Sequence, residues 1–214
     1  MNCDQKEILA RLKAEHPALC KLIPQVEEAF ALLKSAYDAG GKVMICGNGG
    51  SAADSEHIVG ELMKGFLKKR PIKGAQRAAF DALDGLPAGF ADKLQGALPA
   101  IALPCHTSLT SAYSNDVAAD MIFAQQVFGY GKPGDVLIAL STSGNSKNVV
   151  NAVWAAKAAR VKTIAITGEK ESALSELCDV CLRTPSHETY RVQEYTLPLY
   201  HALCALIEAE YFAE

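Results

Sequence analysis

The chain has 214 residues, of which 50% are hydrophobic and 21% are charged, and its formal net charge is -3. This length accommodates one domain with a substantial core, and the composition excludes a disordered chain. The weakly acidic balance argues against a nucleic-acid or membrane-surface partner, because both usually require a basic field.

The first third of the chain predicts helices, then a strand, a loop and another helix. Apolar residues recur at three- and four-residue spacing through residues 5–39, which indicates helices. The apolar run 42–46 predicts a buried strand. The loop 47–50 follows, and Ser51 is the expected N-cap of a helix that runs to about residue 65. Residues 66–98 are rich in glycine and proline, and they predict an irregular inserted segment that is partly helical.

The remaining chain alternates between strands and helices. Strands are expected at residues 100–103, 135–140, 162–166 and 178–182, and helices at 107–112, 117–128, 147–160 and 187–213. This alternation predicts a three-layer α/β fold, a doubly wound parallel five-stranded sheet with helices on both faces. We expect a single domain over residues 1–214, with an N-terminal helical segment at 1–40. Ligands of such sheets bind beyond the carboxyl ends of the strands.

The sequence Ser141-Thr-Ser-Gly-Asn-Ser146 follows a predicted strand and begins a predicted helix. Hydroxyls and backbone N–H groups converge at such a position, and the helix dipole favours an anion. The loop lacks the lysine of a nucleotide-binding P-loop, which favours a sugar monophosphate over a nucleoside triphosphate. The loop Gly47-Asn-Gly-Gly-Ser51 has the equivalent position after another strand, and its glycines leave room for a ligand.

Two helices carry candidates for proton transfer or metal binding. His57 and Glu61 are four residues apart and share one helix face. Gln193 and His201 are eight residues apart, about two turns, and also share a face. Together they could bind zinc or another divalent ion, or supply the two proton-transfer groups that an isomerase needs. Spacing alone does not decide between these uses and an ordinary solvated helix face.

These motifs resemble the SIS (sugar isomerase) domain family, and within it the phosphoheptose isomerases. The resemblance covers nearly the whole chain in the family's order. It is carried by the Cys46-Gly-Asn-Gly-Gly-Ser-Ala52 stretch, His57 with Glu61, Ser114-Asn-Asp116, the loop 141–146, Thr167-Gly168 and the stretch from Arg191 to His201.

The resemblance implies an aldose–ketose isomerase that converts sedoheptulose 7-phosphate to a manno-heptose 7-phosphate. It implies that Ser141, Thr142, Ser143 and Ser146 hold the phosphate and that Asn48, Gly49, Gly50, Asn115 and Asp116 contact the sugar; Ser51 and Gln193 are included among the expected substrate-binding residues. It also implies that His57, Glu61, Gln193 and His201 ligate zinc, with Glu61 and His201 as the acid/base pair. The resemblance further implies a homotetramer with sites between subunits. In this assembly the N-terminal helices would help to form a helix bundle.

Two other functions are compatible with the same features. A non-catalytic SIS protein could bind a replication initiator or another protein partner through the same architecture. An isomerase of a pentose phosphate or an amino-sugar phosphate is favoured by the extended 66–98 segment. The candidate acid/base set argues for an enzyme, since a binding module has no need of it.

The cysteines and the N-terminus bear on location. Seven cysteines are an odd number, and several lie inside apolar runs, which suits buried thiols in a reducing compartment. The N-terminus begins a polar helix without an apolar signal region. We therefore expect a soluble, cytoplasmic protein.

Overall fold

Five parallel strands form one sheet in the order β2-β1-β3-β4-β5. The structure is a computed structural model that describes residues 1–212; residues 213–214, which the expected 1–214 domain and in part the expected closing helix include, lie outside the described residues. All five expected strands are present, within a few residues of their predicted bounds. They are β1 (Val43–Cys46), β2 (Ala100–Ala102), β3 (Val136–Leu140), β4 (Lys162–Thr167) and β5 (Val180–Arg183).

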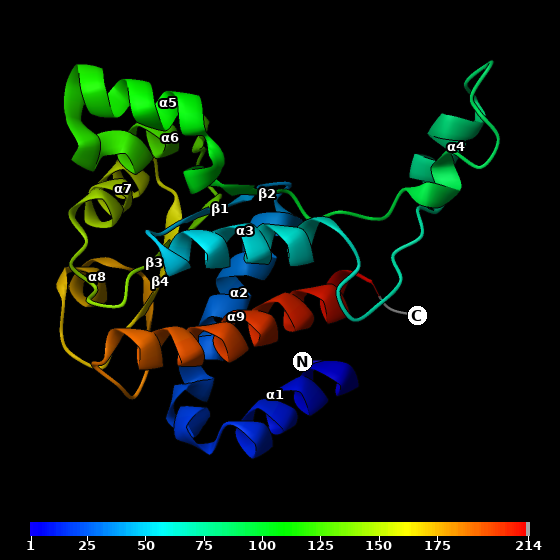
Figure 1. Ribbon diagram of the computed structural model, residues 1–214. Helices are drawn as coiled ribbons and strands as arrows, with labels where there is room; N and C mark the ends of the chain where they lie inside the picture. Colours follow the sequence, from blue (N-terminus) through cyan, green and yellow to red (C-terminus); the bar gives the residue numbers. More distant parts are fainter. Residues whose placement is uncertain (213–214) are drawn as a thin grey trace.

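Helices cover both faces of this sheet (Figure 1). The α-helices are α1 (Cys3–Glu15), α2 (Ile23–Asp38), α3 (Gly50–Met63), α4 (Gly74–Asp81), α5 (Thr107–Tyr113), α6 (Ile122–Tyr130), α7 (Lys147–Ala158), α8 (Ala173–Leu177) and α9 (Thr189–Tyr211). The helix expected at 117–128 begins only at Ile122, because Ala118 has extended backbone (φ -165°, ψ 126°) that interrupts the helical path. A π-helical turn, Ser114–Ala118, precedes it.

Alternate residues of each strand enter different cores, as a pleated strand requires. Val43 and Ile45 of β1 pack in a core with α2, α3 and α9, whereas Met44 and Cys46 pack in a second core with α6, α7 and α8. Both faces are therefore buried, which explains the continuous apolar strand sequences. The doubly wound parallel sheet expected from the sequence is confirmed.

The chain changes direction between β1 and β3, and this places the candidate loops side by side. These two strands are neighbours in the sheet. The helix after β1 packs in one core and the helix after β3 packs in the other. A crevice opens at such a switch point, beyond the carboxyl ends of the strands. The two loops that the sequence singled out, 47–50 and 141–146, both lie at this crevice.

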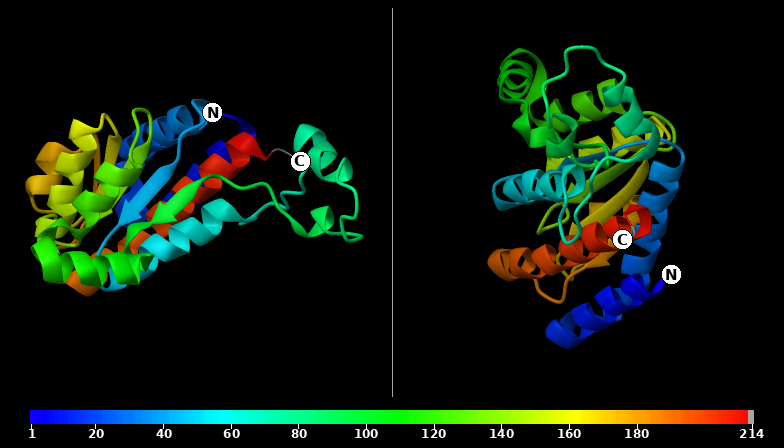
Figure 2. Two further views of the ribbon diagram at one scale, coloured as in Figure 1. Left: turned by 90° about the horizontal axis from the view of Figure 1, so that it is seen from above. Right: turned by 90° about the vertical axis from the view of Figure 1, so that its right-hand side faces the viewer.

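Residues 71–95 form an arm that projects away from the sheet (Figures 1 and 2). Its base is closed by an antiparallel bridge between Pro71 and Gln95. It carries α4, none of whose residues is buried. Within it, Phe80 and Phe90 pack on one another, with ring centroids 6.0 Å apart. The inserted, partly helical segment expected at 66–98 is thus an excursion from the core.

Candidate active site

Three serine hydroxyls converge where β3 ends. The hydroxyl of Ser141 lies 2.9 Å from that of Ser146 and 3.5 Å from that of Ser143. Ser146 is the residue before α7, yet its side chain makes no capping bond to that helix. These hydroxyls therefore face the positive end of the helix dipole together with the first N–H groups of α7. The arrangement has the chemistry of an anion site, as the sequence predicts.

The loop keeps this shape because of Gly144. Its φ is 67°, in the left-handed region that favours glycine, and a side chain there would collide with Ser172. The N–H of Gly144 donates to the carbonyl of Ser141 at 3.0 Å, which closes the turn. A tight turn thus brings hydroxyls that are separated in the sequence to one place.

A pair of amide side chains joins the two loops across the crevice. Asn48 in the loop after β1 and Asn148 in the first turn of α7 donate to each other, at 2.9 and 2.8 Å. This pair fixes the glycine loop next to the serine loop. One part of the sequence interpretation is wrong here: Ser51 is not the N-cap of α3. The positive φ of Gly49, 56°, turns the chain early, so α3 begins at Gly50 and Ser51 lies buried in its first turn.

The start of α9 also reaches this crevice. A Cβ on Gly168, which follows β4, would lie 2.8 Å from the Thr142 carbonyl and 3.3 Å from a methyl of Val192. The side chain of Gln193 lies directly against Gly50, so close that a Cβ there would be 2.5 Å from its amide nitrogen. The loops at 47–50 and 141–146 and the beginning of α9 therefore enclose one region.

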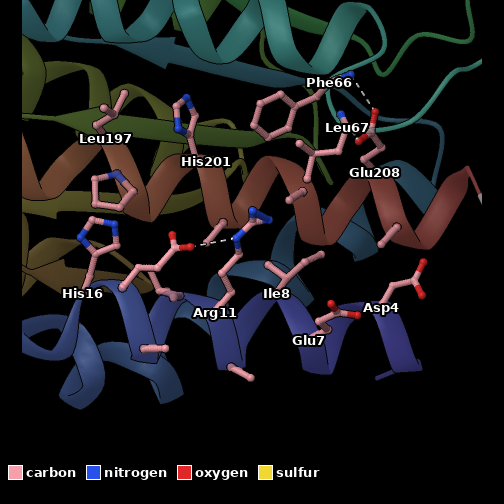
Figure 3. Close-up of a pocket in the computed structure, with 18 of the residues that line it drawn as sticks. Asp4, Glu7, Ile8, Arg11, His16, Phe66, Leu67, Leu197, His201 and Glu208 are labelled. Carbon is pink, nitrogen blue, oxygen red and sulfur yellow. Dashed lines mark hydrogen bonds and ion pairs between the residues drawn. The ribbon is translucent and has the colours of Figure 1, made fainter.

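Further along α3 and α9, the acid/base candidates meet. The Nε2 atom of His57 lies 3.1 Å from Oε1 of Glu61, and the His57 and His201 rings are 5.0 Å apart, edge to face. His201 points from α9 toward α3, beside Phe66 (Figure 3). His201 follows Gln193 by eight residues, about 12 Å along the helix axis. Gln193 at the crevice and His201 at the acid/base cluster are thus about two turns apart on one helix, and α9 links the two parts of the candidate site.

The environment of these groups favours proton transfer. Burial lowers the pKa of His201, the nearby His57 ring lowers it further, and Glu61 opposes the shift. The neutral imidazole is therefore the prevailing form at neutral pH, and it can accept or donate a proton. The other carboxylate oxygen of Glu61 accepts from Lys64 at 3.1 Å.

The donor set fits a divalent cation, although the side chains are not gathered as a finished site. Among the described residues, no three His, Cys, Asp or Glu side chains converge closely enough to hold a metal. However, Nε2 of His201 is buried and has no hydrogen-bond partner within residues 1–212. An orphaned imidazole nitrogen next to a second imidazole and a carboxylate is the chemistry of a zinc or similar site.

A buried ion pair holds α9 against the end of α3. Glu208 of α9 accepts from the backbone N–H groups of residues 66, 67 and 68 at 2.8, 2.7 and 3.1 Å, and from Nε of Arg70 at 2.8 Å. Arg70 in turn donates to the carbonyls of Glu61 and Leu62 at 2.9 and 2.7 Å. Both side chains are almost completely buried. We call this set the Arg70–Glu208 clamp; it ties the backbone of Glu61 to the helix that carries His201.

Two expected sugar contacts lie apart from this cluster. Asn115 donates to Asp116 at 2.8 Å on an exposed π-helical turn. Asp120, a few residues later, pairs with Lys147, the first residue of α7. That pair places the segment near the helix that begins at the serine loop. The structure shows no contact between the Asn115–Asp116 pair and the acid/base cluster.

Sequence reasoning missed three polar neighbours of the site. Asn148 joins the two loops, and Asp54 and Tyr200 form hydrogen bonds behind His57. Asp54 is three residues before His57, so helical spacing could have found it. Tyr200 could not be found in this way, because its partners lie on another helix.

An open groove of about 980 Å³ runs between α1 and α9 (Figure 3). Ile8 and Arg11 of α1 line it, as do Leu67, Leu197 and His201. One edge of the acid/base cluster thus borders a partly apolar groove.

In the part of the chain that the structure describes, no helix is long and apolar enough to cross a membrane.

Proteins with SIS domains, phosphoheptose isomerases among them, resemble this chain in sequence and in structure. SIS domain models match residues 105–207 and 16–82. The phosphoheptose isomerase of Rhodospirillum rubrum is 40% identical over 86% of this chain and 85% of its own, and that of Citrifermentans bemidjiense is 36% identical over 97% of each. The structure of phosphoheptose isomerase GmhA from Neisseria gonorrhoeae superimposes with a TM-score of 0.74, at 32% identity, over 96% of this chain and 98% of that one.

Proposed function

Because the chain belongs to the phosphoheptose isomerase family of SIS-domain proteins, we propose that it is an aldose–ketose isomerase that converts sedoheptulose 7-phosphate to a manno-heptose 7-phosphate. The observation that carries the proposal is the meeting of Glu61, His57 and His201 from two helices, in a chain that also has a serine-lined anion site beyond the carboxyl end of β3.

Substrate binding follows from the two loops. We assign Ser141, Thr142, Ser143 and Ser146 to the phosphate, since the three serine hydroxyls converge beside the first N–H groups of α7 and Thr142 lies in the same loop. Asn48, Gly49, Gly50, Ser51, Gln193, Asn115 and Asp116 are assigned to the sugar chain. Asn48 pairs with Asn148 beside the serine loop, and Gln193 lies against Gly50; the assignment of Asn115 and Asp116, which lie apart from the acid/base cluster, rests on the family resemblance. Anchoring the phosphate orients the other end of the substrate toward α3 and α9.

The chemistry needs one base for carbon and one group that exchanges protons with oxygen. Glu61 removes a proton from C1 of the ketose, giving an enediol, and returns a proton to C2. Neutral His201 gives a proton to the carbonyl oxygen at C2 and then takes one from the hydroxyl at C1, so that the aldose forms with no net change in protons. The reverse assignment of the two residues balances in the same way. Each group typically contributes about 10²–10⁴-fold in rate.

We assign His57, Glu61, Gln193 and His201 as ligands of one zinc or similar divalent ion. The orphaned Nε2 of His201 and the adjacent imidazole and carboxylate support this assignment. Such an ion, when bound, stabilises negative charge on the sugar oxygens. Elemental analysis of protein purified without added zinc tests it, and activity that a chelator leaves unchanged would exclude it.

Replacing the proposed base tests the function itself. We expect Glu61→Gln to lose nearly all turnover of sedoheptulose 7-phosphate and to keep binding of the phosphate ester, because the serine loop is untouched. The control is Glu56→Gln, an exposed carboxylate on the same helix. Full activity in Glu61→Gln would refute the assignment.

A thermal-shift series of C5, C6 and C7 sugar phosphates identifies the substrate, since the ligand that binds the native state most tightly stabilises it most. Stabilisation by a pentose or amino-sugar phosphate alone would favour the alternative substrates.

We also propose that the protein is a homotetramer with sites between subunits. The groove between α1 and α9, partly apolar and bordered by His201, supports an interface there. Light scattering after gel filtration tests it, and a monomer at assay concentration would refute it. Its cytoplasmic location stays a prediction from the cysteine pattern and the N-terminal sequence.

A further inference from the structure

Tyr200 lies at the centre of the acid/base cluster but has no role in the chemistry proposed above. It precedes His201 on α9, and only 1% of its surface is exposed. Its ring meets the rings of both His57 and His201 edge to face, at 5.5 and 4.9 Å. Its hydroxyl lies between Asp54 and His57, both on α3.

The hydrogen bonds of this hydroxyl determine where the proton of His57 lies. Tyr200 donates to Oδ1 of Asp54 at 3.2 Å, and its oxygen is 2.9 Å from Nδ1 of His57. A phenol has one proton to donate, and its oxygen can also accept. With that proton directed at the Asp54 carboxylate, the second bond forms only if Nδ1 of His57 carries a proton and donates it.

The opposite arrangement is unfavourable. If Tyr200 donated to Nδ1 of His57, its oxygen would turn a lone pair toward the Asp54 carboxylate. Two acceptors would then face each other across 3.2 Å in a half-buried place. An acceptor buried without a donor loses free energy relative to water. The Asp54 carboxylate thus orients the phenol, and the phenol orients the imidazole.

A neutral imidazole carries a proton on one nitrogen only. A proton on Nδ1 leaves Nε2 as the nitrogen that can offer a lone pair; it lies 3.1 Å from Oε1 of Glu61, and these two acceptors need a cation or a second proton between them. The geometry points to Tyr200 as a positioning residue that, together with Asp54, holds His57 in the Nδ1–H tautomer with its Nε2 lone pair available to a divalent cation. This inference deepens the proposed function and rests on it for its catalytic meaning.

Removal of the hydroxyl reverses the preference. In Tyr200→Phe the ring contacts remain, but Nδ1 of His57 loses its acceptor. The tautomer with the proton on Nε2 then becomes the more stable one, because Nε2–H can donate to Oε1 of Glu61. The lone pair of His57 would then lie on Nδ1 and no longer face Glu61. Loss of a hydrogen-bond partner that orients a metal-binding histidine typically costs about 10–100-fold in metal affinity.

The tautomer can be read directly. We expect ¹⁵N NMR spectra of histidine side chains in the metal-free protein, at about pH 8, above the ordinary histidine pKa, to show His57 protonated on Nδ1. In Tyr200→Phe, and equally in Asp54→Ala, the signal should move toward the Nε2–H form. Affinity for Zn²⁺ alone, measured by competition with a chelating dye, should fall about 10–100-fold in both variants.

Tyr37→Phe is the matched control. It removes the hydroxyl of another tyrosine, one that donates to the carbonyl of Pro99 away from the cluster, and it should change neither measurement. An unchanged His57 tautomer in Tyr200→Phe would overturn the inference. Isomerase activity of the unmodified protein is a separate measurement: its absence would refute the proposed function, while the tautomer shift would still decide the role of Tyr200.

Discussion

Glu208→Ala should be among the most destabilising single substitutions in this protein. Glu208 is 1% exposed, and its carboxylate accepts four hydrogen bonds, three from backbone N–H groups and one from Arg70. Its removal leaves those donors without an acceptor and leaves the buried Arg70 guanidinium without its carboxylate partner. Breaking a buried ion pair by deleting one partner costs about 3–5 kcal/mol. That is a large share of the roughly 5–15 kcal/mol that stabilises a typical domain.

The loss should be smaller in a variant that keeps an acceptor. Glu208→Gln retains one oxygen but loses the charge and exchanges the other oxygen for a donor, so we expect about 1–3 kcal/mol. The matched control is Glu194→Ala on the same helix, since Glu194 pairs with Arg191 on an exposed surface. Exposed pairs of this kind contribute at most about 1 kcal/mol.

Equilibrium unfolding in urea at one fixed protein concentration measures all three variants, and an unchanged slope keeps the comparison valid. The order of the losses should be Glu208→Ala, then Glu208→Gln, then Glu194→Ala. A loss below about 1 kcal/mol for Glu208→Ala would refute the reasoning, because it would mean that the buried charge finds water or another partner at little cost. Because Arg70 binds the Glu61 carbonyl, activity of the folded Glu208→Gln variant should fall as well.

Three further predictions concern the loop, the arm and the sheet. Gly144→Ala should raise KM for a sugar phosphate, because its positive φ and its contact with Ser172 force the serine loop to shift; unchanged KM would show that the loop tolerates the side chain. Replacement of residues 72–94 by two glycines should leave the melting temperature within a few degrees, since the base is already bridged and Ala91 is the only buried residue of that range; a collapse of cooperative melting would show that the arm is structural. Burial of Asp179 raises its pKa, but hydrogen bonds from Lys162 and Thr163 outweigh that effect. The pKa of Asp179 is therefore held below the ordinary value. Its contribution is therefore present above about pH 4 and is lost as pH falls, so Asp179→Asn should flatten the acid limb of the stability curve, and an unchanged limb would contradict this.

Local patterns were sufficient for much of the fold and part of the site. The short apolar runs predict the strands because a strand buried on both faces must be apolar throughout, as Val43–Cys46 is. The serine loop was recognisable because its hydroxyls lie within six residues between a strand and a helix. His57 and Glu61 were paired because a helix places residues four apart on one face.

The helix starts were less predictable, since they depend on backbone angles that the residue types only favour. Ser51 is a good capping residue, but Gly49 can adopt positive φ and begins the helix earlier. Likewise the extended backbone at Ala118 delays α6 to Ile122. In both places the backbone conformation of one residue decided where the helix begins.

The sequence alone determined features made by neighbours along the chain: the five strands, most of the amphipathic helices, the anion loop and the His57–Glu61 pair. The tertiary structure decided which helices meet. The pairing of Asn48 with Asn148, of Arg70 with Glu208 and of Tyr200 with two residues of α3 joins positions between 100 and 146 residues apart. No local pattern encodes such contacts, because they follow from the order of the strands and from the face of the sheet on which each helix packs.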